Sequence, residues 1–239
     1  MEIKLPNINR VFTEPKYNCN MCQDIGYTFI VNNGYQAAQK CECQIQKENI
    51  KKIERSGLQE LIKKCTFENF DIKEDYQKHM LCMAKEFIEQ KEYPFFYIGG
   101  QVGCGKTHIC TALSVHYLNK RYSVAYKVYD KIIRNLKANV NDTSLYNKIM
   151  YKLQNTEVLY IDDLFKTGNN EKPTDADIRH IFNLINQRYI SKKITILSAE
   201  RNIDEIIGID EGLGSRIKQM CGPYCLAIRN EKGRNWRLK

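Results

Sequence analysis

The sequence predicts an α/β protein: a mainly parallel sheet with helices on both faces, preceded by a small cysteine-rich domain. After about residue 65, short apolar runs alternate with helical patterns, which is typical of a parallel sheet covered on both sides. One of these runs leads directly into the glycine-rich stretch GGQVGCGKTH. Upstream, four of the ten cysteines fall between residues 19 and 43.

The elements expected along the chain follow from local patterns. Residues 1–18, with two prolines, predict an irregular arm, and NNG between GYTFIV and YQAAQ predicts a β-hairpin. Residues 45–64 have a charged helical pattern and form a connector that is broken near Ser56-Gly57. Strands are expected in FFYIGG, SVAYKVY, EVLYIDD, ITILSAE and YCLAIR. Helices are expected from Thr107, from Asp130, from about Thr174 to Tyr189, and as short segments after ITILSAE. We therefore divide the chain into domains at 1–60 and 61–239.

Composition limits the compartment and the partners. No run of 18 apolar residues exists and the N-terminus lacks a secretion pattern, so we expect a cytoplasmic protein that does not enter a membrane. The net charge of +9 is uneven, because residues 214–239 hold seven Lys/Arg against one acid and residues 120–137 hold six against one. Such segments favour nucleotide or nucleic-acid partners, although a merely soluble basic surface is the alternative.

The stretch GGQVGCGKTH fits the P-loop pattern of a strand, a glycine-rich turn and a helix. Glycines let backbone N–H groups close around phosphates, and the helix N-terminus favours anions. Lys106 would contact the β- and γ-phosphates of ATP, and the Thr107 hydroxyl would bind Mg²⁺. The nucleotide-binding residues expected from this loop are Gly100, Gly103, Cys104, Gly105, Lys106 and Thr107.

Polar residues follow two further apolar strands. Asp162 and Asp163 end VLYIDD, where the first acid would hold Mg²⁺ and the second would polarise the attacking water, unless the pair is an ordinary turn. ITILSAE ends with Ser198 and Glu200, which could sense the γ-phosphate or the water. Arg216 in GLGSRIKQ is either a solvated charge or an arginine finger that acts on a neighbouring subunit.

Cys19, Cys22, Cys41 and Cys43 form a C-x2-C and a C-x-C on either side of the predicted hairpin. Four thiolates that arrive from two directions suit tetrahedral Zn²⁺, and a reducing compartment disfavours disulfides. The isolated cysteines are interpreted as structural, and Cys221-x3-Cys225 lacks the partners that a second metal site needs.

In this order and spacing, GQVGCGKTH, VLYIDDL and LGSRI resemble the AAA+ ATPases of the DnaC/DnaI helicase-loader group, with the IstB-like ATPases as relatives. KCTFENFD resembles the segment that leads into their nucleotide domain near the base, and the cysteine pattern resembles the N-terminal zinc module of DnaI-type and phage-encoded loaders. The resemblance implies an AAA+ core, and because the chain stops soon after its last strand we expect it to lack the usual C-terminal lid.

Carried over to this chain, the resemblance makes Asp162 the Walker B acid and places Asp163 where a glutamate is usual, which is expected to slow hydrolysis. Ser198 stands as the sensor in a Ser-Ala-Glu ending where relatives have Ser/Thr-x-Asn. Arg216 matches the arginine-finger box, and Arg237 is a candidate substitute for a sensor-2 contact.

The implied activity is ATP-dependent loading of a hexameric replicative DNA helicase onto single-stranded DNA at replication initiation. ATP would drive homo-oligomer assembly, and the zinc module would hold the helicase. In YKVYDKIIRNLK, Tyr126 and Tyr129 either stack on bases or alternate in a half-buried strand. Two other functions remain open: an IstB-like transposition helper that acts on duplex DNA, and a zinc-ribbon adaptor whose ATP site is only a switch.

Overall fold

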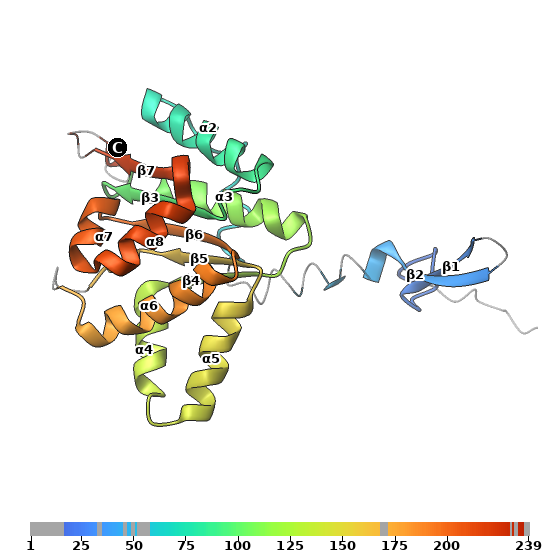
Figure 1. Cartoon of the computed structure of the whole chain (residues 1–239). Coiled ribbons are helices and arrows are strands. Elements are labelled where there is room, and N and C mark those ends of the chain that lie inside the picture. The colour runs from blue at the N-terminus through green and yellow to red at the C-terminus, as the bar shows by residue number, and fades with distance from the viewer. Residues whose placement is uncertain are drawn as a thin grey trace, which may run out of the picture. The chain divides into compact units, whose positions relative to one another are not determined.

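The computed structural model describes residues 17–32, 35–44, 47–48, 51, 58–167, 172–229, 231 and 234–236 (Figure 1). Its contacts divide the chain into two compact units, Met1–Glu48 and Asn49–Lys239, which are treated separately below. The predicted arm lies almost entirely outside the described residues, as do half of the predicted connector and the whole of Arg237. The domain boundary near residue 60 stays a prediction.

The first unit contains the expected hairpin. Strands β1 (Tyr27–Asn32) and β2 (Tyr35–Lys40) pair antiparallel, with Tyr27 opposite Lys40 and Asn32 opposite Tyr35. Every residue of β2 is exposed, so this small sheet has no apolar core of its own on that strand. A unit of this size depends on a cross-link or a metal for its stability.

The second unit is built on a five-stranded parallel sheet, as predicted. Its strands are β3 (Phe95–Gly100), β4 (Val124–Val128), β5 (Val158–Asp162), β6 (Ile194–Ala199) and β7 (Cys225–Ile228). They lie in the order β4-β5-β6-β3-β7, and each neighbouring pair is parallel. The carboxyl ends of β3, β5 and β6 therefore meet at one edge, with β6 between the other two.

Helices cover both faces of this sheet (Figure 1). Helices α2 (Asp75–Glu89) and α3 (Lys106–Asn119) pack on one face. The other face carries α4 (Tyr129–Ala138), α5 (Thr143–Asn155), α6 (Asp175–Ile190), α7 (Ile203–Ile209) and α8 (Glu211–Cys221). A short 3₁₀ turn, η1 (Gly222–Tyr224), leads into β7. Alternate strand residues face opposite cores, so Phe96 packs with α2 and α3 while Tyr97 packs on the other side.

Two helices, α2 and α5, were not predicted from the sequence. The predicted connector helix is described only in part, and Leu58–Lys64 forms consecutive turns in which the Ile62 N–H donates to the Leu58 carbonyl at 2.9 Å. Among the described residues, the structure contains no helix that is both long and apolar enough to cross a bilayer.

A fully buried arginine ties together the end of the sheet away from the P-loop. The Arg188 guanidinium, 0% exposed, donates to the Thr156 carbonyl at 2.8 Å and the Ile194 carbonyl at 2.6 Å. It also donates to Leu153 O, Gln154 O, Glu157 O and Thr195 Oγ1. Because these acceptors end α5 and begin β5 and β6, one side chain fixes three elements to one another.

Candidate functional site

The P-loop has the backbone geometry that its glycines predict. Gly103 and Gly105 have φ angles of 76° and 100°, in the left-handed region that favours glycine. A Cβ atom on Gly105 would lie 2.9 Å from Cε2 of Phe70. Gly105 is the N-cap of α3, so the first N–H groups of that helix are directed toward the loop. The arrangement suits the binding of an anion.

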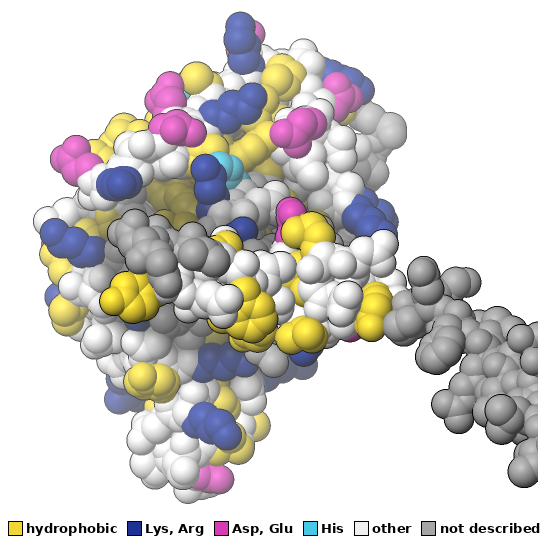
Figure 2. Space-filling model, turned by 90° about the vertical axis from the view of Figure 1, so that its right-hand side faces the viewer, with side chains coloured by type: hydrophobic (Ala, Val, Ile, Leu, Met, Phe, Trp, Pro, Cys, Tyr) yellow, Lys and Arg dark blue, Asp and Glu magenta, His cyan; other side chains and the backbone are white. Residues whose placement is uncertain are grey.

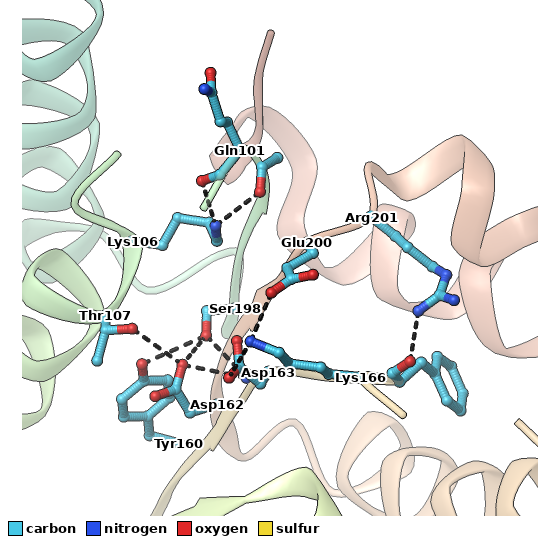
Figure 3. A network of polar contacts seen from close by, with 12 residues as sticks. Gln101, Lys106, Thr107, Tyr160, Asp162, Asp163, Lys166, Ser198, Glu200 and Arg201 are labelled. Carbon is cyan, nitrogen blue, oxygen red and sulfur yellow. Dashed lines mark hydrogen bonds and ion pairs between the residues drawn. The ribbon is translucent and has the colours of Figure 1, made fainter. Parts of the chain in front are cut away.

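Lys106 and Thr107 are the first two residues of α3, and their side chains have different partners. Lys106 is buried, and its ammonium donates to the carbonyls of Gly100 and Gln101, both at 2.7 Å (Figure 3). The Thr107 hydroxyl faces β5 and donates to Oδ1 of Asp162 at 3.4 Å. The chain therefore brings the P-loop hydroxyl into contact with the first strand-end acid.

Asp162 is held by donors from three elements of the sheet. The Ser198 hydroxyl forms a short hydrogen bond to its Oδ1, and the Asp163 N–H reaches the same atom at 3.2 Å. The Tyr126 hydroxyl, on β4, donates to Oδ2 at 3.2 Å. Burial and the Asp162 charge raise the pKa of Tyr126, so this phenol stays a donor at any working pH. The carboxylate is thus fixed in orientation before any ligand arrives.

The second acid, Asp163, lies on the wall of a hollow of about 260 Å³. This hollow is lined by Val102, Gly103, Gly105, Lys106, Thr107, His108, Asp163, Lys166, Glu200 and Trp236. The Lys166 ammonium lies between the two acids, 3.3 Å from Asp163 Oδ2 and 2.6 Å from Glu200 Oε1 (Figure 3). The hydrogen bond that Lys166 donates to Glu200 raises the pKa of Lys166, which keeps this side chain charged.

A second hollow, of about 410 Å³, adjoins the other side of the loop. Phe70, His108 and Trp236 contribute aromatic surface, and Asn69 and Gln77 contribute amides. His108 Nε2 lies 2.8 Å from the Thr66 carbonyl and the imidazole packs edge-on to Phe70, which holds KCTFENFD against the start of α3. Trp236 lies beside the P-loop, because its main-chain N–H donates to the Gly103 carbonyl at 3.2 Å.

Three further predicted residues, Ser198, Arg216 and Cys104, are buried or packed against neighbouring side chains. Ser198 is fully buried behind Asp162 and is not part of the described lining of the first hollow, whereas Glu200 is. Arg216 lies on α8, where its guanidinium stacks on Phe182 at 5.1 Å and donates to the Gly212 carbonyl at 2.7 Å. Cys104 is buried inside the P-loop, and burial raises the pKa of its thiol.

Of the two alternatives left open for the tyrosines, stacking on DNA bases is wrong for Tyr129. That side chain is 2% exposed and packs edge-on to Phe165, because it begins α4 on the buried side of the sheet. Tyr126 is half-buried and its hydroxyl is bonded to Asp162, which matches the half-buried strand alternative. The basic side chains Lys131, Arg134 and Lys137 of α4 remain exposed. On the face seen in Figure 2, Lys and Arg are mixed with Asp and Glu.

In the first unit the four predicted cysteines form a cluster. Their sulfur atoms all lie within 4.8 Å of one another, with Cys19 and Cys41 3.7 Å apart and Cys22 and Cys43 3.4 Å apart. Tetrahedral Zn²⁺ with bonds of about 2.3 Å requires sulfur atoms about 3.8 Å apart, so the arrangement fits a zinc ion. The cluster is consistent with the predicted zinc module.

The surroundings of these thiols support metal binding. The backbone N–H of Cys22 lowers the pKa of the Cys19 thiol to about 7, whereas the Cys22 thiol and burial raise the pKa of Cys43 to about 12. The Gly26 N–H donates to the Cys22 sulfur at 3.3 Å, and the Asp24 carboxylate accepts from the Cys19 N–H at 3.0 Å. Four crowded thiols ionise together only when a cation compensates their charge.

Several functional candidates were not apparent in the sequence. Lys166 follows Asp163 by three positions in a turn, and Trp236 lies far from the P-loop in sequence. Neither has a periodic pattern that would mark it. The Tyr126 hydroxyl reaches Asp162 only because β4 pairs with β5, a neighbour relation that no local pattern specifies.

Comparison with known proteins gives a family and related chains. The profile of the bacterial DnaA ATPase domain matches residues 61–221. The uncharacterized protein YqaM of Bacillus subtilis is 36% identical over 205 residues, which cover 82% of this chain and 64% of YqaM. The replicative helicase loader DnaC of Buchnera aphidicola (subsp. Schizaphis graminum) is 28% identical over 114 residues, 46% of each chain. This chain thus spans less than two thirds of the length of either relative.

Among solved structures, that of the DnaC helicase loader aligns with a TM-score of 0.59 at 20% identity. The alignment covers 71% of this chain and 98% of the DnaC chain. This similarity confirms the predicted fold of a parallel sheet with helices on both faces.

Proposed function

We propose that this chain, which belongs to the bacterial DnaA ATPase domain family, is an ATPase that loads a replicative DNA helicase onto single-stranded DNA. The observation that carries the proposal is the P-loop hollow, where Lys106, Thr107 and the strand-end acids converge. The helicase part rests on the identity with the helicase loader DnaC and on the cysteine module ahead of the ATPase unit.

The triphosphate would lie in the 260 Å³ hollow at the N-terminus of α3. There Lys106 would exchange its bonds to the Gly100 and Gln101 carbonyls for bonds to the β- and γ-phosphates. The backbone N–H groups from Gly103 to Lys106 would surround the phosphates. The adenine base would enter the adjoining hollow, whose aromatic and amide lining suits a flat, polar-edged ring.

Thr107 and Asp162 would hold Mg²⁺, which supplies charge neutralisation at the phosphates. Asp163 would accept the proton of the attacking water, since its carboxylate lines the hollow directly after the metal-side acid Asp162. Its carboxylate is shorter than that of glutamate, so we expect slow turnover. Ser198 would act through Asp162, whose orientation it fixes, and would not contact the phosphate itself.

Arg216 would act on the nucleotide of a neighbouring subunit in an ATP-dependent homo-oligomer. Its guanidinium is held by Phe182 and by the Gly212 carbonyl, so it is oriented on α8 without a carboxylate partner among the described residues. An arginine placed in this way can stabilise the charge that develops on a transferred phosphoryl group.

The first unit would be the helicase-binding module, with Zn²⁺ held by Cys19, Cys22, Cys41 and Cys43. Zn²⁺ would supply the cross-link that the hairpin needs. Single-stranded DNA would contact exposed basic side chains, including Lys131 and Arg134 on α4. Those contacts are electrostatic and should weaken as salt is raised.

The test measures three activities of the full chain: ATP hydrolysis, capture of the hexameric replicative helicase, and transfer of that helicase to a single-stranded circle. We expect all three to require ATP and to be lost in Lys106→Ala. Lys148→Ala, which removes an exposed lysine of α5, is the matched control and should retain all three. ATP turnover with no helicase capture would refute the loader function. Stimulation by duplex DNA and not by single strands would favour a transposition helper instead.

A further inference from the structure

The P-loop lysine is not alone at the hollow, because Lys166 presents a second ammonium group there. This residue follows β5 in a sharply turned segment, in which Asp163 and Phe165 have φ angles of 56° and 58°. The turn is fixed by the Leu164 N–H, which donates to the Ser198 carbonyl at 2.8 Å, and by the Arg201 guanidinium, which donates to the Phe165 carbonyl. The backbone therefore holds Lys166 in place while its side chain remains about half exposed.

The contacts of Lys166 occupy the acid that would act on water. Its ammonium lies 3.3 Å from Asp163 Oδ2 and 2.6 Å from Glu200 Oε1, as Figure 3 shows. The ammonium thereby occupies the Asp163 oxygen that an attacking water would have to approach. Both acids and Lys166 are about one third to one half exposed, so the pairs are weak and can be exchanged.

The charges around the hollow favour such an exchange when a triphosphate enters. Without Lys166, Asp163 and Glu200 would present two negative charges to an anionic ligand. A terminal phosphate carries more charge than either carboxylate and offers several acceptor oxygens, so it competes well for an ammonium group. ADP lacks the γ-phosphate, whereas the β-phosphate that it shares with ATP remains within reach of Lys106 and the loop N–H groups.

We propose that Lys166 is a second phosphate-binding lysine. When ATP binds, Lys166 breaks its ion pairs with Asp163 and Glu200 and contacts the terminal phosphate, and Asp163 is then free to act as the base. This inference rests on the proposed ATPase function and assigns a role to a residue of the same site. In the reaction, the water oxygen forms a bond to the terminal phosphorus while the bond from that phosphorus to the bridging oxygen breaks. The water proton passes to Asp163, and ADP and inorganic phosphate leave.

A purely structural role predicts a different result. If Lys166 only compensates the charges of Asp163 and Glu200, its loss should weaken the binding of ATP and ADP together. Removing one of those charges should then restore binding. If Lys166 contacts the terminal phosphate, its loss should affect ATP selectively, and removing an acidic charge should not replace the missing contact.

The experiment measures the Kd of the full chain for ADP and for AMPPCP, a non-hydrolysable ATP analogue, together with kcat for ATP. For Lys166→Ala we expect AMPPCP binding to weaken about tenfold or more, as for loss of one charge-assisted hydrogen bond. The Kd for ADP should change less than about twofold, because ADP has no γ-phosphate for Lys166 to contact and so loses no hydrogen bond in this variant. The double variant Lys166→Ala/Glu200→Gln should stay weak for AMPPCP, and Lys166→Arg should recover part of the affinity and of kcat.

The proposal would be overturned if Lys166→Ala weakened the binding of AMPPCP and ADP equally, or if AMPPCP binding recovered in the double variant. Lys148→Ala is the matched surface control and should match the wild type. Lys106→Ala tests the nucleotide site itself, because this variant should lose the binding of both AMPPCP and ADP. A wild-type chain that binds neither nucleotide would refute the ATPase function itself, whereas selective binding by the wild type that survives in Lys166→Ala would refute only the role of Lys166.

Discussion

The hydroxyl of Tyr126 offers a direct test of how the metal-side acid is oriented. Tyr126→Phe removes the donor 3.2 Å from Oδ2 of Asp162 and keeps the ring, which packs on Tyr160 with centroids 5.1 Å apart. Thr107, Ser198 and the Asp163 N–H all donate to the other oxygen, Oδ1. The substitution therefore frees one side of the carboxylate to rotate.

The expected magnitude follows from the bond that is lost. A hydrogen bond to a charged group contributes about 1.5–3 kcal/mol, and 3.2 Å is long for a hydroxyl donor, so we take the lower end. About 1.5 kcal/mol corresponds to roughly a tenfold weaker affinity for Mg²⁺ in the presence of ATP, in the range found when residues that orient metal ligands are changed.

The assay titrates Mg²⁺ at fixed ATP and follows hydrolysis, with nucleotide affinity in the absence of Mg²⁺ as the second readout. We expect the half-maximal Mg²⁺ concentration to rise about tenfold, while Mg²⁺-free nucleotide binding stays the same. Tyr151→Phe, on a tyrosine that is 69% exposed on α5, is the control. An unchanged Mg²⁺ requirement would show that Oδ1 contacts alone orient Asp162 and would refute this reasoning.

Three further predictions concern other parts of the chain. Cys41→Ser should release zinc, measured with a chromogenic chelator, and abolish helicase capture while the Kd for ATP stays unchanged; joint loss of both would contradict the division into two units. Gly105→Ala should destabilise the ATPase unit by about 1–3 kcal/mol in denaturant unfolding, because its φ is 100° and its Cβ would lie 2.9 Å from Phe70. Trp236 is the sole tryptophan and its main-chain N–H donates to the Gly103 carbonyl, so its fluorescence should change saturably with ATP in the wild type and not in Lys106→Ala. An emission that does not respond to ATP would place the nucleotide elsewhere.

Much of the fold could be predicted because its signals are local. The apolar runs that form β3, β5 and β6 are buried on both faces, so their sequences read as continuous hydrophobic segments. The P-loop and the strand-end acids follow these runs directly, and the topology of parallel strands brings them to one edge. Helix α5 was missed because it buries only Met150 and Leu153, which leaves a weak apolar period in a polar segment.

The remaining site residues depend on contacts between distant segments. Arg234, which pairs with Glu74 at 3.4 Å and stacks on Tyr76, helps bring the chain near Trp236 beside the loop, and no local pattern specifies those contacts. The sequence also could not separate Ser198 from Glu200, since both stand at the end of the segment ITILSAE. Alternation along the strand turns the first inward to Asp162, while the second lies beyond the strand on the wall of the hollow.

The Arg188 anchor has a consequence for how the ATPase unit can move. One guanidinium binds the carbonyl of Glu157, directly before β5, and that of Ile194, the first residue of β6. These two strands therefore cannot slide past each other without breaking its hydrogen bonds. Asp162 and Ser198, at the far ends of the same strands, therefore keep a constant spacing through a nucleotide cycle. We expect the site to adjust to the ligand through rotation of long side chains such as Lys106 and Lys166, while the backbone of β5 and β6 stays in place. In hydrogen exchange, the amides of β5 and β6 should exchange equally slowly with and without nucleotide, while protection changes are confined to the P-loop and to the turn that carries Lys166.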